Sequence, residues 1–183
     1  SRARQMAKPR KVPTDHRRQG QGIKPRSAKR EREYTIRREL VRKVLTVLSL
    51  VLKLPYDYLW NLSKKYETEG DDFLRYMLVH RPPQEDDAAS KGVRIQGHTD
   101  FGSVTLLWSQ PIASLEVLGK DNVWRTVRHK PNALIVNLGD SLHFLSGGYL
   151  RATIHRVVAP PEDQLQYARL NVLYFSMFDN DVK

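Results

Sequence analysis

Two short motifs, 55 positions apart, carry side chains of the types that together bind one metal ion. His98 and Asp100 are two positions apart, so both side chains point to the same face of an extended strand. His155 lies in a β-branched run, 152–157, that is also typical of a strand. Two imidazoles and one carboxylate form the facial triad that holds non-haem Fe(II) and leaves the opposite coordination positions open. The pattern therefore predicts a metal site built from these three residues.

A single arginine follows this pattern. Arg169 lies 14 positions after His155, at the start of an apolar run, 170–175. The apolar strand draws Arg169 inward, where its guanidinium can bind a carboxylate through two parallel hydrogen bonds.

The motifs that flank these residues have the order and spacing of a known family. The run 73–178 resembles the C-terminal, iron-binding part of the 2-oxoglutarate-dependent dioxygenases of the isopenicillin-N-synthase-like superfamily, and its fungal members most closely. The resemblance covers more than half of the chain and rests on the segments 73–77, 97–105, 107–111, 136–140, 145–148 and 152–157 and on the Arg169 strand.

The resemblance implies an activity and a set of cofactors. Fe(II) is expected on His98, Asp100 and His155, which are then also the catalytic set. The co-substrate 2-oxoglutarate is expected to place its far carboxylate on Arg169, and O2 to take the last position on the ion. The implied reaction is hydroxylation, desaturation or ring closure of a small organic molecule, coupled to decarboxylation of 2-oxoglutarate to succinate.

Some positions near the expected site depart from the family pattern. Asn171 stands where many relatives have a serine that assists the co-substrate carboxylate, and its amide can also donate a hydrogen bond. His80 lies near the position of a tyrosine that contacts 2-oxoglutarate in relatives, so His80 is a candidate replacement. Tyr76, Thr105 and Trp108 are candidates for the substrate side, although core packing explains them equally well.

The charge of the chain is concentrated at one end. The net charge is +11, and residues 1–33 hold twelve Lys and Arg against three acids, which leaves 11 − 9 = +2 for the other residues. Residues 1–28 are therefore expected to form a basic, disordered tail, and any affinity for nucleic acid belongs to that tail.

The absence of cysteine excludes a thiolate metal site and fits a cytoplasmic protein. The longest apolar run, 44–54, is too short to cross a bilayer.

The hydrophobic pattern predicts a mainly β fold with N-terminal helices. Helices are expected over 29–53 and 56–66, within a segment, 29–69, that packs on the sheet. Residues 70–183 are expected to form the dioxygenase domain, which the resemblance identifies as a double-stranded β-helix, or jelly roll. Strands are expected at 73–80, 93–98, 101–108, 115–118, 123–127, 133–138, 142–145, 149–158 and 169–177, with a loop at 81–91.

Two other functions are also compatible with the sequence. Relatives carry a substantial N-terminal region that this sequence lacks, so the chain is expected to expose apolar surface, and a truncated, catalytically silent metal-binding domain is the alternative function. A nucleic-acid-modifying enzyme is a third reading. It is disfavoured because nucleic-acid-demethylating dioxygenases carry a second arginine six positions after the first, where this chain has Phe175.

Overall fold

The computed structural model describes residues 28–63, 71–80, 90–180 and 182, and side chains from residue 38 onward. The expected tail and most of the expected loop at 81–91 lie outside the described residues. The described elements are, in chain order, α1 (Ala28–Val51), α2 (Tyr58–Asn61), β1 (Phe73–Val79), β2 (Val93–His98), β3 (Val104–Trp108), β4 (Leu115–Leu118), β5 (Trp124–Thr126), β6 (Leu134–Leu138), α5 (Asp140–Leu145), β7 (His155–Val158), the 3-10 turn η1 (Glu162–Gln164) and β8 (Arg169–Ser176).

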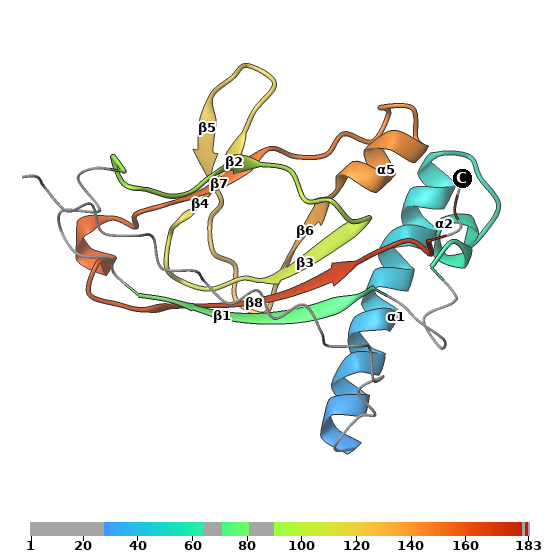
Figure 1. The fold of residues 1–183 in the computed structure, drawn as a ribbon, viewed down its shortest axis with the longest axis horizontal. Helices are drawn as coiled ribbons and strands as arrows, with labels where there is room; N and C mark the ends of the chain where they lie inside the picture. The colour runs from blue at the N-terminus through green and yellow to red at the C-terminus, as the bar shows by residue number, and fades with distance from the viewer. Residues whose placement is uncertain (1–27, 64–70, 81–89, 181, 183) are drawn as a thin grey trace, which may run out of the picture.

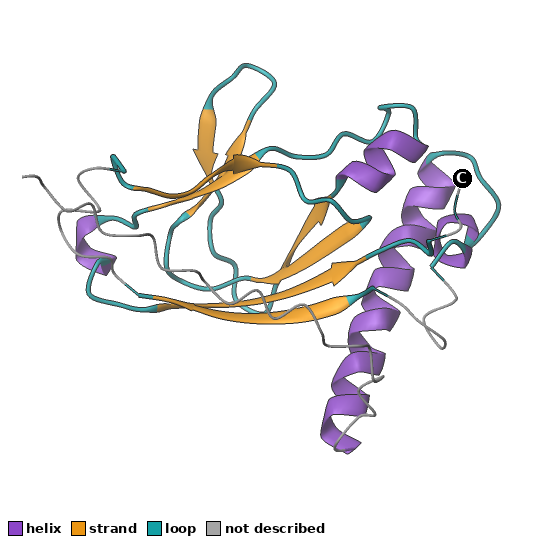
Figure 2. Cartoon of the chain, in the orientation of Figure 1, coloured by secondary structure: helices purple, strands orange, loops and turns teal. Residues whose placement is uncertain are grey.

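The strands form two sheets of four, and every pair is antiparallel. One sheet has the order β1-β8-β3-β6 and the other β2-β7-β4-β5. The two sheets face each other, and the α-helices lie at one end of the pair, opposite the end where η1 lies (Figures 1 and 2). This arrangement confirms the expected jelly roll.

Helix α1 packs against the outer face of the first sheet. Val41 and Leu45 of α1 are buried with Val104 and Leu106 of β3 and Tyr174 of β8 in one hydrophobic cluster. Each such aliphatic side chain contributes roughly 1.5–3 kcal/mol when it is fully removed from water. Because strand side chains alternate, the residues between them point the other way, into the space between the sheets.

The second helix is shorter in the structure than the sequence pattern predicts. A second helix was expected over 56–66, but α2 is a single turn, and residues 64–66 lie outside the described part. Lys53 and Asp57 both adopt left-handed backbone conformations, with φ of 58° and 60°. The Asp57 carboxylate accepts hydrogen bonds from Arg42, at 2.7 Å, and from Thr46 of α1. A left-handed residue cannot continue a right-handed helix, so α2 begins only at Tyr58.

Two expected strands are corrected by the structure. Residues 142–145 belong to helix α5. The prediction was wrong because a run of four residues is too short for its hydrophobic pattern to distinguish a helix turn from a strand. The strand expected over 149–158 is regular only from His155 onward. Gly147 and Gly148, with φ of 60° and 83°, turn the chain, and the segment that follows has no regular structure before β7.

Some apolar side chains of α1 face outward. Val47, Leu50 and Val51 are each more than half exposed. Among the described helices, none combines the length and the apolar composition that crossing a membrane requires.

Candidate metal centre

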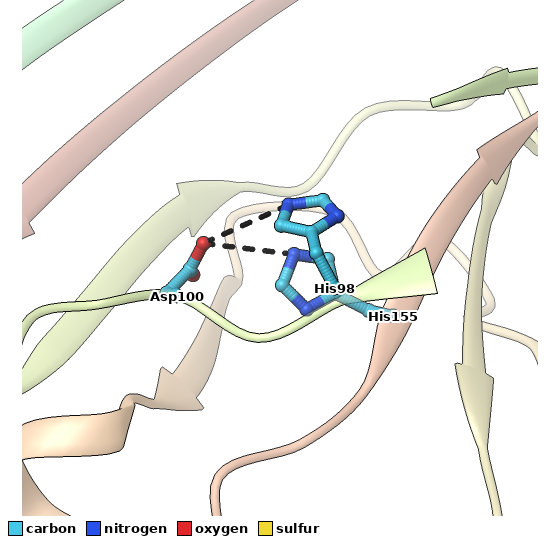
Figure 3. Close-up of side chains that lie close together, drawn as sticks. All are labelled: His98, Asp100 and His155. Atoms are coloured by element: carbon cyan, nitrogen blue, oxygen red, sulfur yellow. Dashed lines mark ion pairs between the residues drawn. The ribbon is translucent and has the colours of Figure 1, made fainter. Parts of the chain in front are cut away.

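The three residues of the expected triad converge at one end of the space between the sheets. His98 is the last residue of β2, His155 is the first of β7, and the two are direct partners across the strand pair. Asp100 lies two residues beyond His98 and faces both rings (Figure 3). Its Oδ1 atom is 3.7 Å from Nε2 of His155 and 4.0 Å from Nε2 of His98.

A break in the β2 register turns His98 inward. Ile95 and His98 are three positions apart, so a regular strand would point them to opposite faces. The pairing of β2 with β7 shifts between these residues, and both line the same cavity. A bulge of this kind redirects one side chain and is common beside functional sites.

Hydrogen bonds determine which nitrogen of each imidazole is free. Nδ1 of His98 lies 2.8 Å from the carbonyl oxygen of Gln96, and Nδ1 of His155 lies 3.0 Å from that of Thr153. A carbonyl only accepts, so both Nδ1 atoms carry the proton. In the neutral ring this tautomer places the lone pair on Nε2, and both Nε2 atoms face Asp100, the orientation that metal-binding histidines require.

The carboxylate of Asp100 is oriented in the same manner. Its Oδ2 atom accepts hydrogen bonds from Oγ1 of Thr105, at 2.7 Å, and from Nδ2 of Asn137, at 2.6 Å. The other oxygen, Oδ1, faces the imidazoles and is left for a metal ion. Two neutral nitrogens and one anionic oxygen, each held by a neighbour, fit a divalent iron ion.

The loop that carries Asp100 is held by the turn before α5. The backbone N–H of Asp140 donates to the carbonyl of Asp100, at 2.8 Å, and Oγ1 of Thr99 donates to the Asp140 carboxylate, at 2.9 Å. Gly139 makes this approach possible, since a Cβ atom there would lie 2.1 Å from the carbonyl oxygen of Gly102 and 2.7 Å from that of Asp100.

A cavity of about 180 Å³ opens from the triad into the space between the sheets. Its walls come from both sheets and are mainly apolar. Arg169 and Asn171 of β8 also line it, and both are buried, at 6% and 3% exposure. Burial lowers the pKa of Arg169 to about 10, so the guanidinium is protonated at neutral pH.

Two polar groups of β8 have unused hydrogen-bonding capacity in this cavity. Nε of Arg169 and Nδ2 of Asn171 are buried, and neither has a hydrogen-bond partner in the described part of the chain. Oδ1 of Asn171 accepts a hydrogen bond from Nε2 of Gln110, at 3.0 Å. Buried donors without partners are costly, so a cationic and an amide donor together indicate a site for an anionic ligand.

Of the three residues expected on the substrate side, the structure places only Thr105 in the cavity lining. Tyr76 is 59% exposed and lies between Arg75 and Met77, which do line the cavity, so it points to the other face. Trp108 packs against the hydrophobic cluster under α1. Thr105 lines the cavity, but its hydroxyl is used by Asp100.

His80 is likewise not placed at the site. It follows the end of β1, is exposed and does not line the cavity. Met77 instead lies directly across from Asn171 in the strand pair. Sequence reasoning assigned no role to Asn137, Gly139, Met77 or Gln110. All four lie in segments that carry the family resemblance, namely 73–77, 107–111 and 136–140, and these segments were the available signal for them.

Known proteins share this fold and these motifs. The chain is 35% identical over 140 residues to the 2-oxoglutarate-dependent dioxygenase frbH of Dothideomycetidae sp. (strain 11243), a match that covers 75% of this chain and 41% of that protein. The crystal structure of a 2OG-Fe(II) oxygenase family protein from Caulobacter crescentus has a similar fold, with a TM-score of 0.70, 29% identity, and coverage of 82% of this chain and 46% of that one.

A further structure is similar at slightly lower identity. JOX2 in complex with 2OG, Fe and JA matches with a TM-score of 0.66 and 26% identity, over 79% of this chain and 40% of that one. The chain thus spans less than half the length of these relatives. The sequence model of the 2OG-Fe(II) oxygenase superfamily matches residues 73–177, more than half of the chain. The chain therefore belongs to the 2OG-Fe(II) oxygenase superfamily.

Proposed function

We propose that this chain is the catalytic part of an Fe(II)- and 2-oxoglutarate-dependent oxygenase. The observation that carries the proposal is the presence, in one cavity, of three correctly oriented ligand atoms and a buried arginine without a partner at Nε. The catalytic unit is residues 70–183, with the helical segment 29–69 bracing the outer face of one sheet.

The donor set assigns a role to each residue. His98, Asp100 and His155 would hold Fe(II) through Nε2, Oδ1 and Nε2. When bound, Fe(II) supplies the activation of O2 that couples decarboxylation of 2-oxoglutarate to succinate with oxidation of the substrate. Two neutral ligands and one anion would leave one positive charge on the ion, which one carboxylate of the co-substrate would neutralise, and its second carboxylate remains for Arg169.

The far end of the co-substrate is bound by β8. The guanidinium of Arg169 receives the far carboxylate of 2-oxoglutarate, and Nδ2 of Asn171 donates a further hydrogen bond. This interaction satisfies the two donors that are otherwise buried without partners. The apolar walls, among them Leu107, Ile135 and Leu173, exclude water and strengthen the ionic contact.

The substrate is a small organic molecule, as in fungal secondary metabolism, and the protein acts in the cytoplasm. Support for a small-molecule substrate comes from JOX2, whose structure is a complex with JA. A nucleic-acid substrate is not proposed, because Phe175 stands where nucleic-acid-demethylating dioxygenases carry a second arginine.

The test is an anaerobic titration of the full chain with Fe(II) and then 2-oxoglutarate, followed by visible spectroscopy. The weak charge-transfer band of the chelate is expected for the natural chain and is expected to vanish for His98→Ala. Absence of the band from the natural chain would contradict the proposal.

A catalytically silent metal-binding domain is the second candidate. The observation that favours it is that the chain spans only 41% of the length of frbH. Iron-dependent formation of succinate in air, without added substrate, separates the two candidates. An active oxygenase produces succinate slowly, whereas a silent domain binds the co-substrate and produces none.

A further inference from the structure

A glutamine in the loop between β3 and β4 contacts the cavity wall from outside the cavity, at the end where the co-substrate is expected to bind. Gln110 follows β3 and does not itself line the cavity. Its Nε2 atom donates to Oδ1 of Asn171 over 3.0 Å, across 61 positions of sequence. Gln110 therefore touches a residue of the cavity wall without touching the cavity.

This loop is held on both sides of Gln110. The backbone N–H of Ser109 donates to the carbonyl of Ala133, at 3.1 Å. The backbone N–H of Ala113 donates to Oε1 of Gln164 in η1, at 2.8 Å. Gln110 is thus presented to Asn171 from an anchored backbone, and the group that it turns toward Asn171 is its amide N–H.

The contact determines which end of the Asn171 amide faces the cavity. A primary amide has an accepting oxygen at one end and a donating nitrogen at the other. Because Oδ1 is engaged by Gln110, Nδ2 is directed away from Gln110, and this nitrogen is buried without a partner among the described residues. The reversed amide would present its oxygen to the cavity, and an oxygen repels a carboxylate.

We infer that Gln110 is a positioning residue that holds the Asn171 amide with its N–H group toward the far carboxylate of 2-oxoglutarate. The inference rests on the proposed function and deepens it. An amide at position 171 needs such a partner, whereas a hydroxyl rotates freely and donates unaided.

The first experiment compares the natural chain with Gln110→Met, which keeps the side-chain length and removes the amide. The full chain is loaded with Mn(II), and the Kd for 2-oxoglutarate is measured by calorimetry. Gln110→Met is expected to raise this Kd about three- to tenfold, the worth of one hydrogen bond, and to leave the Kd for Mn(II) unchanged.

Two further measurements exclude a merely structural role. With 2-oxobutyrate, which lacks the far carboxylate, Gln110→Met and the natural chain are expected to bind equally well. In an Asn171→Ser background, Gln110→Met is expected to change the Kd for 2-oxoglutarate less than about twofold. Gln166→Met, the same chemical change at an exposed glutamine that does not line the cavity, serves as the matched control and is expected to leave the Kd unchanged.

The outcomes separate this inference from the proposed function. If the natural chain does not bind 2-oxoglutarate, both fail. If the natural chain binds it and Gln110→Met binds it equally well, the inference fails and the function stands. A loss of affinity that is the same for 2-oxobutyrate, or that persists beside Asn171→Ser, also overturns the inference.

Discussion

Asn137 of β6 donates its amide hydrogen to Oδ2 of Asp100 over 2.6 Å, across 37 positions of sequence. Together with Thr105, it leaves only Oδ1 free toward the two imidazoles. The orientation of the expected metal ligand is thus set by two residues that do not bind the metal.

Removing this support weakens metal binding. Asn137→Ala frees the Asp100 carboxylate to rotate, and the affinity for Mn(II) is expected to fall about 10- to 100-fold, as is usual when a partner of a metal ligand is lost. Calorimetry on the metal-free chain measures this. Asn61→Ala, an exposed asparagine outside the cavity lining, is the control, and equal affinities for the two variants would contradict the assigned role.

Replacing Gly139 is expected to lower both the stability of the chain and its affinity for metal. A Cβ atom in Gly139→Ala would overlap the carbonyl oxygens of Gly102 and Asp100, so the loop must move. We expect the free energy of unfolding in urea to fall by about 1–3 kcal/mol and Mn(II) affinity to fall with it. Gly147→Ala is the comparison, since nothing lies near its Cβ and only its positive φ is strained. That variant should lose stability, by about 1–2 kcal/mol, but retain the metal affinity.

Replacing Arg169 separates stability from binding. Burial disfavours the charged guanidinium, as its lowered pKa of about 10 shows. Arg169→Met removes this buried charge, so the metal-free chain should be at least as stable as the natural one. Because the pKa is far above neutrality, the difference in stability should be constant from about pH 6 to pH 8. The Kd for 2-oxoglutarate should rise at least about 100-fold. A variant that unfolds more easily yet still binds 2-oxoglutarate would contradict both parts.

Asp72 gives a pH dependence of stability. Burial raises its pKa, although its carboxylate accepts hydrogen bonds from the Tyr174 hydroxyl, at 2.8 Å, and from the Met177 N–H, at 2.6 Å. A carboxyl with a raised pKa in the folded state takes up a proton on folding, so its contribution to stability improves as pH falls from neutrality toward the ordinary aspartate value. The free energy of unfolding of the natural chain, relative to Asp72→Asn, should therefore rise over this interval. A difference that is flat, or that falls toward acid, would exclude this assignment.

Local patterns were sufficient for most of the strands and, together with the family spacing, for the identity of the triad. Strands 93–98 and 115–118 were expected with the limits that the structure shows. The triad could be found because His98 and Asp100 share a short motif and His155 has a family spacing from them. The helix α5 was missed because its apolar run is too short for its period to be read.

The features that the sequence did not predict depend on how strands far apart in the sequence pair with one another. The contacts of Asn137 with Asp100 and of Gln110 with Asn171 depend on which strands become neighbours, and no local pattern states that. The candidates for the substrate side show a different cause. Thr105 and Trp108 are three positions apart on one strand, so alternation alone would have placed them on opposite faces. That rule was available from the sequence, and the structure follows it.

Because His98 pairs directly with His155, the two imidazoles can bind one metal ion only when β2 and β7 are correctly aligned. If β2 slipped by one residue against β7, one imidazole would leave the cavity and the ion would lose a ligand. Only the correctly aligned chain binds tightly, so at a metal concentration about 100 times the Kd the aligned state gains about 2.7 kcal/mol over any slipped one. A bound ion would therefore select the correct alignment of the two strands while the chain folds.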